Sequence, residues 1–142
     1  MDQLFPFLAN HPMLTAAWIG IFIAILVVSI RIKLSPVKQL SPQELTFVVN
    51  KQEGVIVDIR NDADFKKSRI VDSIHVSNDK INKNELSALE KHKDKPIIVV
   101  CVAGISAASA ADKLVKAGFS NVNLLKGGMN AWVNAGLPVV KK

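Results

Sequence analysis

Residues 96–106 read Pro-Ile-Ile-Val-Val-Cys-Val-Ala-Gly-Ile-Ser, and Cys101 is the single cysteine of the 142-residue chain. The apolar run that ends at Cys101 predicts a buried central strand, and the alanine-rich residues 107–117 predict a helix. A loop between such a strand and a helix N-terminus brings the sulfur close to backbone N–H groups, which favour a thiolate over a thiol. A lone cysteine is more often a small buried hydrophobe. This position instead indicates a nucleophile.

A second feature, near the N-terminus, predicts a membrane span. Residues 13–30 carry no charge, and a helix of that length extends about 27 Å, close to the roughly 30 Å of a bilayer hydrocarbon core. Residues 1–12 would form a short segment beyond it. A cleaved signal peptide would need positive charge before the run and a small-residue cleavage site after it. Here only Asp2 is charged before the run, whereas Arg31 and Lys33 follow at once.

The flanking charges also predict an orientation. Arg31, Lys33 and Lys38 follow the span, and positive residues favour the cytoplasmic side of a membrane. We therefore expect a single-pass protein with its N-terminus outside and its C-terminal domain in the cytoplasm. A free cysteine agrees with this orientation, because the cytosol is reducing.

Composition narrows the range of partners. The chain has a net charge of +6, and its lysines are spread along the sequence, which suits a solvated face next to anionic membrane lipid. Nucleic-acid binding would call for a basic stripe interleaved with aromatic residues. The chain has no Tyr and six Phe, so we expect no nucleic-acid partner. One cysteine and three scattered histidines predict no metal site, and we expect no cofactor.

The pattern of residues 37–142 predicts one α/β domain with a mainly parallel central sheet flanked by helices, because apolar strands alternate with helical segments. A capping motif at Ser41-Pro42-Gln43-Glu44 predicts a helix start. The expected strands are residues 37–40, 55–59, 70–76, 97–101 and 122–125. The expected helices are residues 41–50, 84–93 and 107–117, a short turn over 62–66, and a last helix that carries Met129 and Trp132.

Three motifs together resemble the rhodanese (sulfurtransferase) family. They are Asp58-Ile59-Arg60 followed by Asp64-Phe65, the strand and loop around Cys101, and the closing residues 124–138 with Gly127-Gly128, Trp132 and Ala-Gly-Leu-Pro. The likeness covers residues 37–140. With one N-terminal span, the layout is similar to that of bacterial membrane-anchored single-domain rhodaneses, which implies the bacterial inner (plasma) membrane.

This resemblance implies a carrier of sulfane sulfur. A thiolate at Cys101 would take sulfur from a donor such as thiosulfate, hold it as a persulfide and pass it to a thiol or to cyanide. Backbone N–H groups of the following loop would hold the terminal sulfur. Asp58 and Arg60 would give structural support. The expected substrate-binding loop is Val102, Ala103, Gly104, Ile105, Ser106 and Ala107.

The loop departs from the family pattern Cys-x-x-Gly-x-Arg-Ser, because Ser106 and Ala107 stand in place of Arg and Ser. An anionic donor thereby loses a charge-assisted partner worth about 1.5–3 kcal/mol. Three interpretations follow: a slow enzyme, a donor other than thiosulfate such as a protein persulfide, or a catalytically weak or inactive module that binds membrane-protein partners. A phosphatase or arsenate reductase would need Cys-x5-Arg. That arginine is absent here, since none occurs from residue 104 to 142.

Overall fold

A computed structural model describes residue 6 and residues 9–141, so most of the predicted segment 1–12 and the terminal Lys142 lie outside the described residues. The chain divides into two compact units, Met1–Ser35 and Pro36–Lys142.

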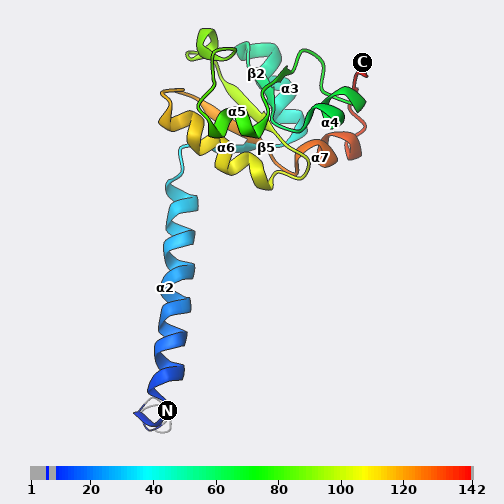
Figure 1. Cartoon of the computed structure of the whole chain (residues 1–142). Helices are drawn as coiled ribbons and strands as arrows, with labels where there is room; N and C mark the ends of the chain where they lie inside the picture. Colours follow the sequence, from blue (N-terminus) through cyan, green and yellow to red (C-terminus); the bar gives the residue numbers. More distant parts are fainter. Residues whose placement is uncertain (1–5, 7–8, 142) are drawn as a thin grey trace. The chain divides into compact units, whose positions relative to one another are not determined.

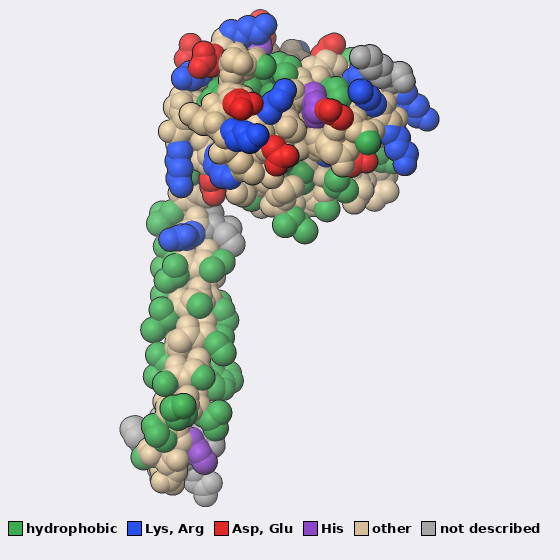
Figure 2. Space-filling model, in the orientation of Figure 1, with side chains coloured by type: hydrophobic (Ala, Val, Ile, Leu, Met, Phe, Trp, Pro, Cys, Tyr) green, Lys and Arg blue, Asp and Glu red, His purple; other side chains and the backbone are tan. Residues whose placement is uncertain are grey.

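The first unit contains α2 (Pro12–Leu34), which extends beyond the predicted span 13–30 at both ends. Proline occupies its first turn, and Arg31 and Lys33 lie in its last turn. Hydrophobic side chains cover the helix along its length (Figure 2). Its residues Pro12–Arg31 have a mean hydropathy of 2.5. That length and composition fit a membrane span, and a signal sequence near the N-terminus meets the same criteria.

The second unit is built on a five-stranded sheet of parallel strands in the order β1-β5-β4-β2-β3. The strand rich in β-branched residues that precedes Cys101 is central and buried along its whole length, as predicted. The strands are β1 (Lys38–Leu40), β2 (Val55–Asp58), β3 (Ile74–His75), β4 (Ile97–Val100) and β5 (Val122–Leu125).

Helices cover both faces of the sheet (Figure 1). They are α3 (Pro42–Gln52), α4 (Asp62–Lys67), α5 (Asn78–Asn82), α6 (Ile105–Lys116) and α7 (Gly128–Asn134), with a short 3-10 helix at Glu90–His92. Side chains alternate between the two faces of β4. Ile97 and Val99 pack with the alanines of α6, whereas Ile98 and Val100 pack with residues of α3 and α7. The predicted α/β architecture with a mainly parallel sheet is confirmed.

Some predicted elements were wrong in detail. Residues 84–93 form turns and the 3-10 helix rather than an α-helix, because Asn84 adopts the left-handed conformation with φ 59° and breaks the helical path. The helical turn of this region lies earlier, in α5. The predicted strand 70–76 shrinks to Ile74–His75, since Asp72 also has a positive φ. Helix α6 begins at Ile105 instead of Ala107.

Candidate active site at the carboxyl edge of the sheet

The candidate site lies where the central parallel strands end. Cys101 follows β4, Asp58 is the last residue of β2, and Gly127 follows β5 shortly after its end. From β2, the chain passes to β3 on one side and later to β4 on the other. In open α/β sheets, ligands bind outside the carboxyl ends of the strands at such a change of direction.

Cys101 is held at the start of α6 by a tight turn. Its Sγ accepts a hydrogen bond from the Gly104 N–H, with an N–S distance of 2.8 Å. Gly104 is the N-cap residue of α6 and has φ +88°, a conformation that a side chain resists. The positive end of the helix dipole therefore lies close to the sulfur, as the sequence predicts. Cys101 is 3% exposed, so the turn encloses its side chain.

A second turn, at the start of α7, fastens this loop from the other side. The Met129 N–H donates to the Cys101 carbonyl at 2.8 Å, and the Asn130 N–H donates to the Val102 carbonyl at 3.1 Å. Gly128 makes this contact possible, because a Cβ there would lie 2.4 Å from the Cys101 carbonyl oxygen. The position of Cys101 therefore depends on α7 as well as on its own loop.

Most of the predicted binding loop faces solvent, but Ala107 does not. Val102, Ala103, Ile105 and Ser106 are exposed, and Gly104 is half-buried. Ala107 is fully buried in the core between α6 and the sheet. Its side chain therefore packs inside the domain rather than lining a surface loop, in contrast to the other five residues.

Asp58 and Arg60 form a buried ion pair at the end of β2. Arg60 Nη2 lies 2.6 Å from Asp58 Oδ2 and also donates to the Ser68 carbonyl at 2.6 Å. The Arg60 carbonyl lies 2.7 Å from His75 Nε2. These contacts join the end of β2 to the end of α4 and to β3. The charge of Arg60 is thus neutralised by Asp58.

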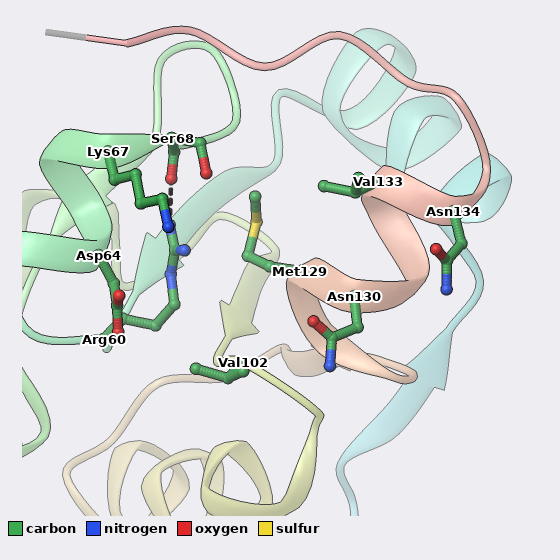
Figure 3. A pocket seen from close by; sticks show the side chains of 9 residues that line it. All are labelled: Arg60, Asp64, Lys67, Ser68, Val102, Met129, Asn130, Val133 and Asn134. Carbon is green, nitrogen blue, oxygen red and sulfur yellow. Dashed lines mark hydrogen bonds between the residues drawn. The ribbon is translucent and has the colours of Figure 1, made fainter.

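A pocket of about 390 Å³ opens between α4 and α7 and borders the Cys101 loop at Val102. We call it the α4–α7 pocket. Figure 3 shows residues of α4 on one side of it and residues of α7 on the other. The residues that line it are Arg60, Asp64, Lys67, Ser68, Val102, Met129, Asn130, Val133 and Asn134.

Sequence reasoning did not single out Lys67, Asn130 or Gly128 as site residues. Lys67 is one of many lysines in the chain, and nothing in its neighbours distinguishes it. The Gly127-Gly128 pair at a strand–helix junction was the available signal, because adjacent glycines there indicate close backbone approach. Among the described residues, no group of three His, Cys, Asp or Glu side chains is arranged to hold a metal ion.

Comparison with known proteins agrees with this geometry. The family model described as "Rhodanese-like domain" matches residues 41–135. The chain is 40% identical to "Uncharacterized protein YibN" of Escherichia coli (strain K12) over 99% of both chains. It is 36% identical to "Thiosulfate sulfurtransferase GlpE" of Coxiella burnetii (strain RSA 331 / Henzerling II) over 67% of this chain and 86% of that protein.

A solved structure shares the fold. The rhodanese-related protein of Thermoplasma volcanium superposes with a TM-score of 0.66, over 74% of this chain and 99% of the other, at 24% identity. The match to the family model spans the elements from α3 to α7, which include the Cys101 turn and most of the sheet. This chain belongs to the family of rhodanese-like domain proteins.

Proposed function

We propose that this protein is a membrane-anchored sulfurtransferase that carries sulfane sulfur as a persulfide on Cys101. The single observation that supports this most is the Gly104 N–H aimed at the Cys101 sulfur at the N-terminus of α6. Donors so placed stabilise a sulfur anion. The thiosulfate sulfurtransferases that resemble the chain over residues of this domain are consistent with the proposal.

The proposed reaction is a transfer between sulfur atoms. The thiolate of Cys101 attacks the outer sulfur of the donor and forms a new sulfur–sulfur bond. The donor's own sulfur–sulfur bond breaks, and its electron pair leaves with the inner sulfur, as sulfite when the donor is thiosulfate. A thiol or cyanide then removes the outer sulfur from Cys101 and regenerates the thiolate. The exposed residues Val102, Ala103, Ile105 and Ser106 would form the rim that substrates meet.

The test of this proposal is intact-mass spectrometry of the purified full chain in detergent after exposure to thiosulfate or to cysteine persulfide. We expect a gain of one sulfur atom on the wild-type chain and none on Cys101→Ser, a nearly isosteric change. Circular dichroism would check that the variant keeps its fold. Sulfur loading or thiosulfate:cyanide turnover that persists in Cys101→Ser would overturn the proposal.

We further propose that α2 is the anchor, that residues 13–30 cross the bacterial inner membrane, and that residues 37–142 form the cytoplasmic domain. The apolar side chains of α2 whose burial the structure describes are exposed, which supports a lipid environment. Arg31 and Lys33 in its last turn support the orientation. A membrane-impermeant thiol reagent should label Cys101 after permeabilisation of cells and not before. Carbonate extraction should leave the protein in the membrane fraction.

A second candidate is a weakly active or inactive module that binds partner proteins at the membrane. The observation that favours it is the apolar rim of the loop, where Ile105 is 85% exposed and Val102 is 49% exposed. Exposed aliphatic side chains of this kind are common in protein interfaces. The two candidates differ in one result: a chain that binds partners through Ile105 but never gains sulfur at Cys101 would be the binding module.

A further inference from the structure

The α4–α7 pocket is larger than a small inorganic anion requires. Its volume of about 390 Å³ falls within the range of roughly 300–1,000 Å³ that is usual for sites of organic ligands. It borders the loop at Val102, the residue directly after Cys101. A ligand whose sulfur reacts at Cys101 would therefore have room for an organic body beside the loop.

One cation in this pocket is available to a ligand. Arg60 also lines the pocket, but its guanidinium is held by Asp58 and by the Ser68 carbonyl. Lys67, at the end of α4, is exposed and makes no ion pair within the described part of the chain. A carboxylate on the ligand would thus meet the Lys67 ammonium, in a site whose loop lacks the family's arginine.

The same pocket offers an anion and two side-chain amides. Asp64 lies one turn before Lys67 on α4, and its carboxylate makes no ion pair among the described residues. Asn130 and Asn134 lie on the α7 side (Figure 3). Residues i and i+3 of a helix share a face, so Asp64 and Lys67 lie on the same face of α4, and both line the pocket. This pattern matches a ligand that carries both an ammonium and a carboxylate.

The α7 side of the pocket and the loop supply apolar surface. Val102, Met129 and Val133 line the pocket with aliphatic or thioether side chains, and such surface suits the methylene carbons of a small thiol. An inorganic donor such as thiosulfate has no group that would use this surface or Asp64.

We infer that the α4–α7 pocket binds the amino-acid part of a small zwitterionic persulfide or thiol, with Lys67 on its carboxylate and Asp64 on its ammonium. This inference rests on the proposed sulfur-carrier function and names the substrate class of that site. In the donor direction, the Cys101 thiolate bonds to the outer sulfur of R–S–SH. The bond between the donor's two sulfurs breaks, R–S⁻ leaves with the electron pair, and the proton stays on the transferred sulfur. No separate oxidant or reductant is needed.

The test compares three persulfide donors with the full chain in detergent: cysteine persulfide, cysteamine persulfide, which lacks the carboxylate, and 3-mercaptopropionate persulfide, which lacks the ammonium. The readout is the second-order rate of sulfur gain at Cys101. We expect the wild-type chain to prefer cysteine persulfide to either analogue by about five- to tenfold, the lower range for a charge-assisted contact at an exposed lysine.

Two variants test which residue causes the preference for cysteine persulfide over each analogue. Lys67→Met should abolish the preference over cysteamine persulfide, and Asp64→Asn should abolish the preference over 3-mercaptopropionate persulfide. Lys66→Met is the matched control, because Lys66 is exposed on the same helix but does not line the pocket. The control should keep both preferences. Equal rates for all three donors in the wild-type chain, or a preference unchanged in Lys67→Met, would overturn the inference.

A binding measurement separates this inference from the proposed function. Calorimetric titration of the Cys101→Ser chain with cysteine and with cysteamine does not depend on sulfur transfer. Tighter binding of cysteine that is lost in the Cys101→Ser, Lys67→Met double variant would support the pocket even if no donor loaded Cys101 in the wild-type chain. Loading without any carboxylate or ammonium preference would support the function and reject the pocket.

Discussion

Two glycine turns at the carboxyl edge of the sheet have similar backbones and different tasks. The Cys101–Gly104 turn follows β4 and opens α6, and the Gly127–Gly128 turn follows β5 and opens α7. Both use left-handed glycines, with φ of +88° at Gly104 and +75° at Gly127. The first turn directs an N–H to the sulfur, whereas the second directs N–H groups to the carbonyls of the first. The Cys101–Gly104 turn thus positions the Cys101 sulfur, and the Gly127–Gly128 turn holds the first turn in place.

The two turns also differ in the space that surrounds their glycines. A Cβ at Gly104 would lie 3.1 Å from the Gly127 nitrogen, a tight contact, whereas a Cβ at Gly128 would lie 2.4 Å from the Cys101 carbonyl oxygen, an overlap. The Gly127–Gly128 turn thus tolerates less change than the turn that bears the thiol. Substitutions in the two turns should therefore separate loss of stability from loss of sulfur transfer.

The largest effect is expected for Gly128→Ala. Its Cβ would overlap the backbone of the Cys101 loop and its φ of +59° resists a side chain, so we expect a loss of about 3 kcal/mol in the free energy of unfolding. That corresponds to a fall of roughly 10–20 °C in Tm for a domain of this size. Thermal unfolding followed by circular dichroism measures it.

Gly136→Ala is the matched control for that change, because Gly136 also has a positive φ, of +72°, but nothing lies within 4 Å of its Cβ position. It should cost only the backbone strain, about 1–2 kcal/mol. Equal losses in the free energy of unfolding for the two variants would show that the close contact between Gly128 and the Cys101 carbonyl does not add to the cost of the substitution.

Gly104→Ala is expected to lose less stability than Gly128→Ala and to slow sulfur transfer to Cys101. Its φ of +88° should cost about 1–2 kcal/mol, and the strained turn should move the N–H away from the Cys101 sulfur. The rate of sulfur gain at Cys101 should fall by about tenfold or more. If Gly104→Ala loads sulfur at the wild-type rate, the hydrogen bond to Sγ does not assist the reaction.

A gain is expected from Ser106→Arg, which restores the charge that the loop lacks. Ser106 is exposed on the first turn of α6, so an arginine there would meet an anionic donor without disturbing the core. The kcat/KM for thiosulfate should rise several-fold, mainly through KM. Ser109→Arg, at another exposed position on α6, is a control that should leave kcat/KM unchanged. An unchanged kcat/KM in a folded Ser106→Arg chain would mean that this charge does not limit donor binding.

The smallest effect is expected at His92, which lies outside both turns and should change how stability depends on pH. Burial, with the positive charges of Lys91 and Lys95, lowers the pKa of His92, and its Nδ1 is buried without a hydrogen-bond partner among the described residues. The folded state therefore binds a proton less readily than the unfolded state. The resulting stability is fully present above about pH 6.5 and falls as the pH drops further. His92→Gln should flatten this fall in urea unfolding curves while sulfur loading at Cys101 stays unchanged. An unaltered pH dependence would exclude His92 as its source.

The sequence by itself determined the alternation of strands and helices, the central position of the strand before Cys101, and the apolar helix near the N-terminus. These features follow from local periodicity and from the length of apolar runs, which need no knowledge of distant contacts. The capping residues Ser41 and Glu44 behaved as predicted, and both reciprocal hydrogen bonds of the capping box are present. The helix predicted at residues 84–93 failed because the backbone of Asn84 adopts a positive φ, which periodicity does not report.

Only the tertiary structure decided how the site is assembled. Gly128 lies against the Cys101 carbonyl, and Lys67 lies across a pocket from Asn130, although each pair is far apart in the sequence. The burial of Ala107 also depends on how α6 packs on the sheet. The physical reason is that parallel strands bring the loops after β2, β4 and β5 to one edge, where backbone contacts between turns set the position of the thiol. Such contacts leave little trace in the local pattern of residues.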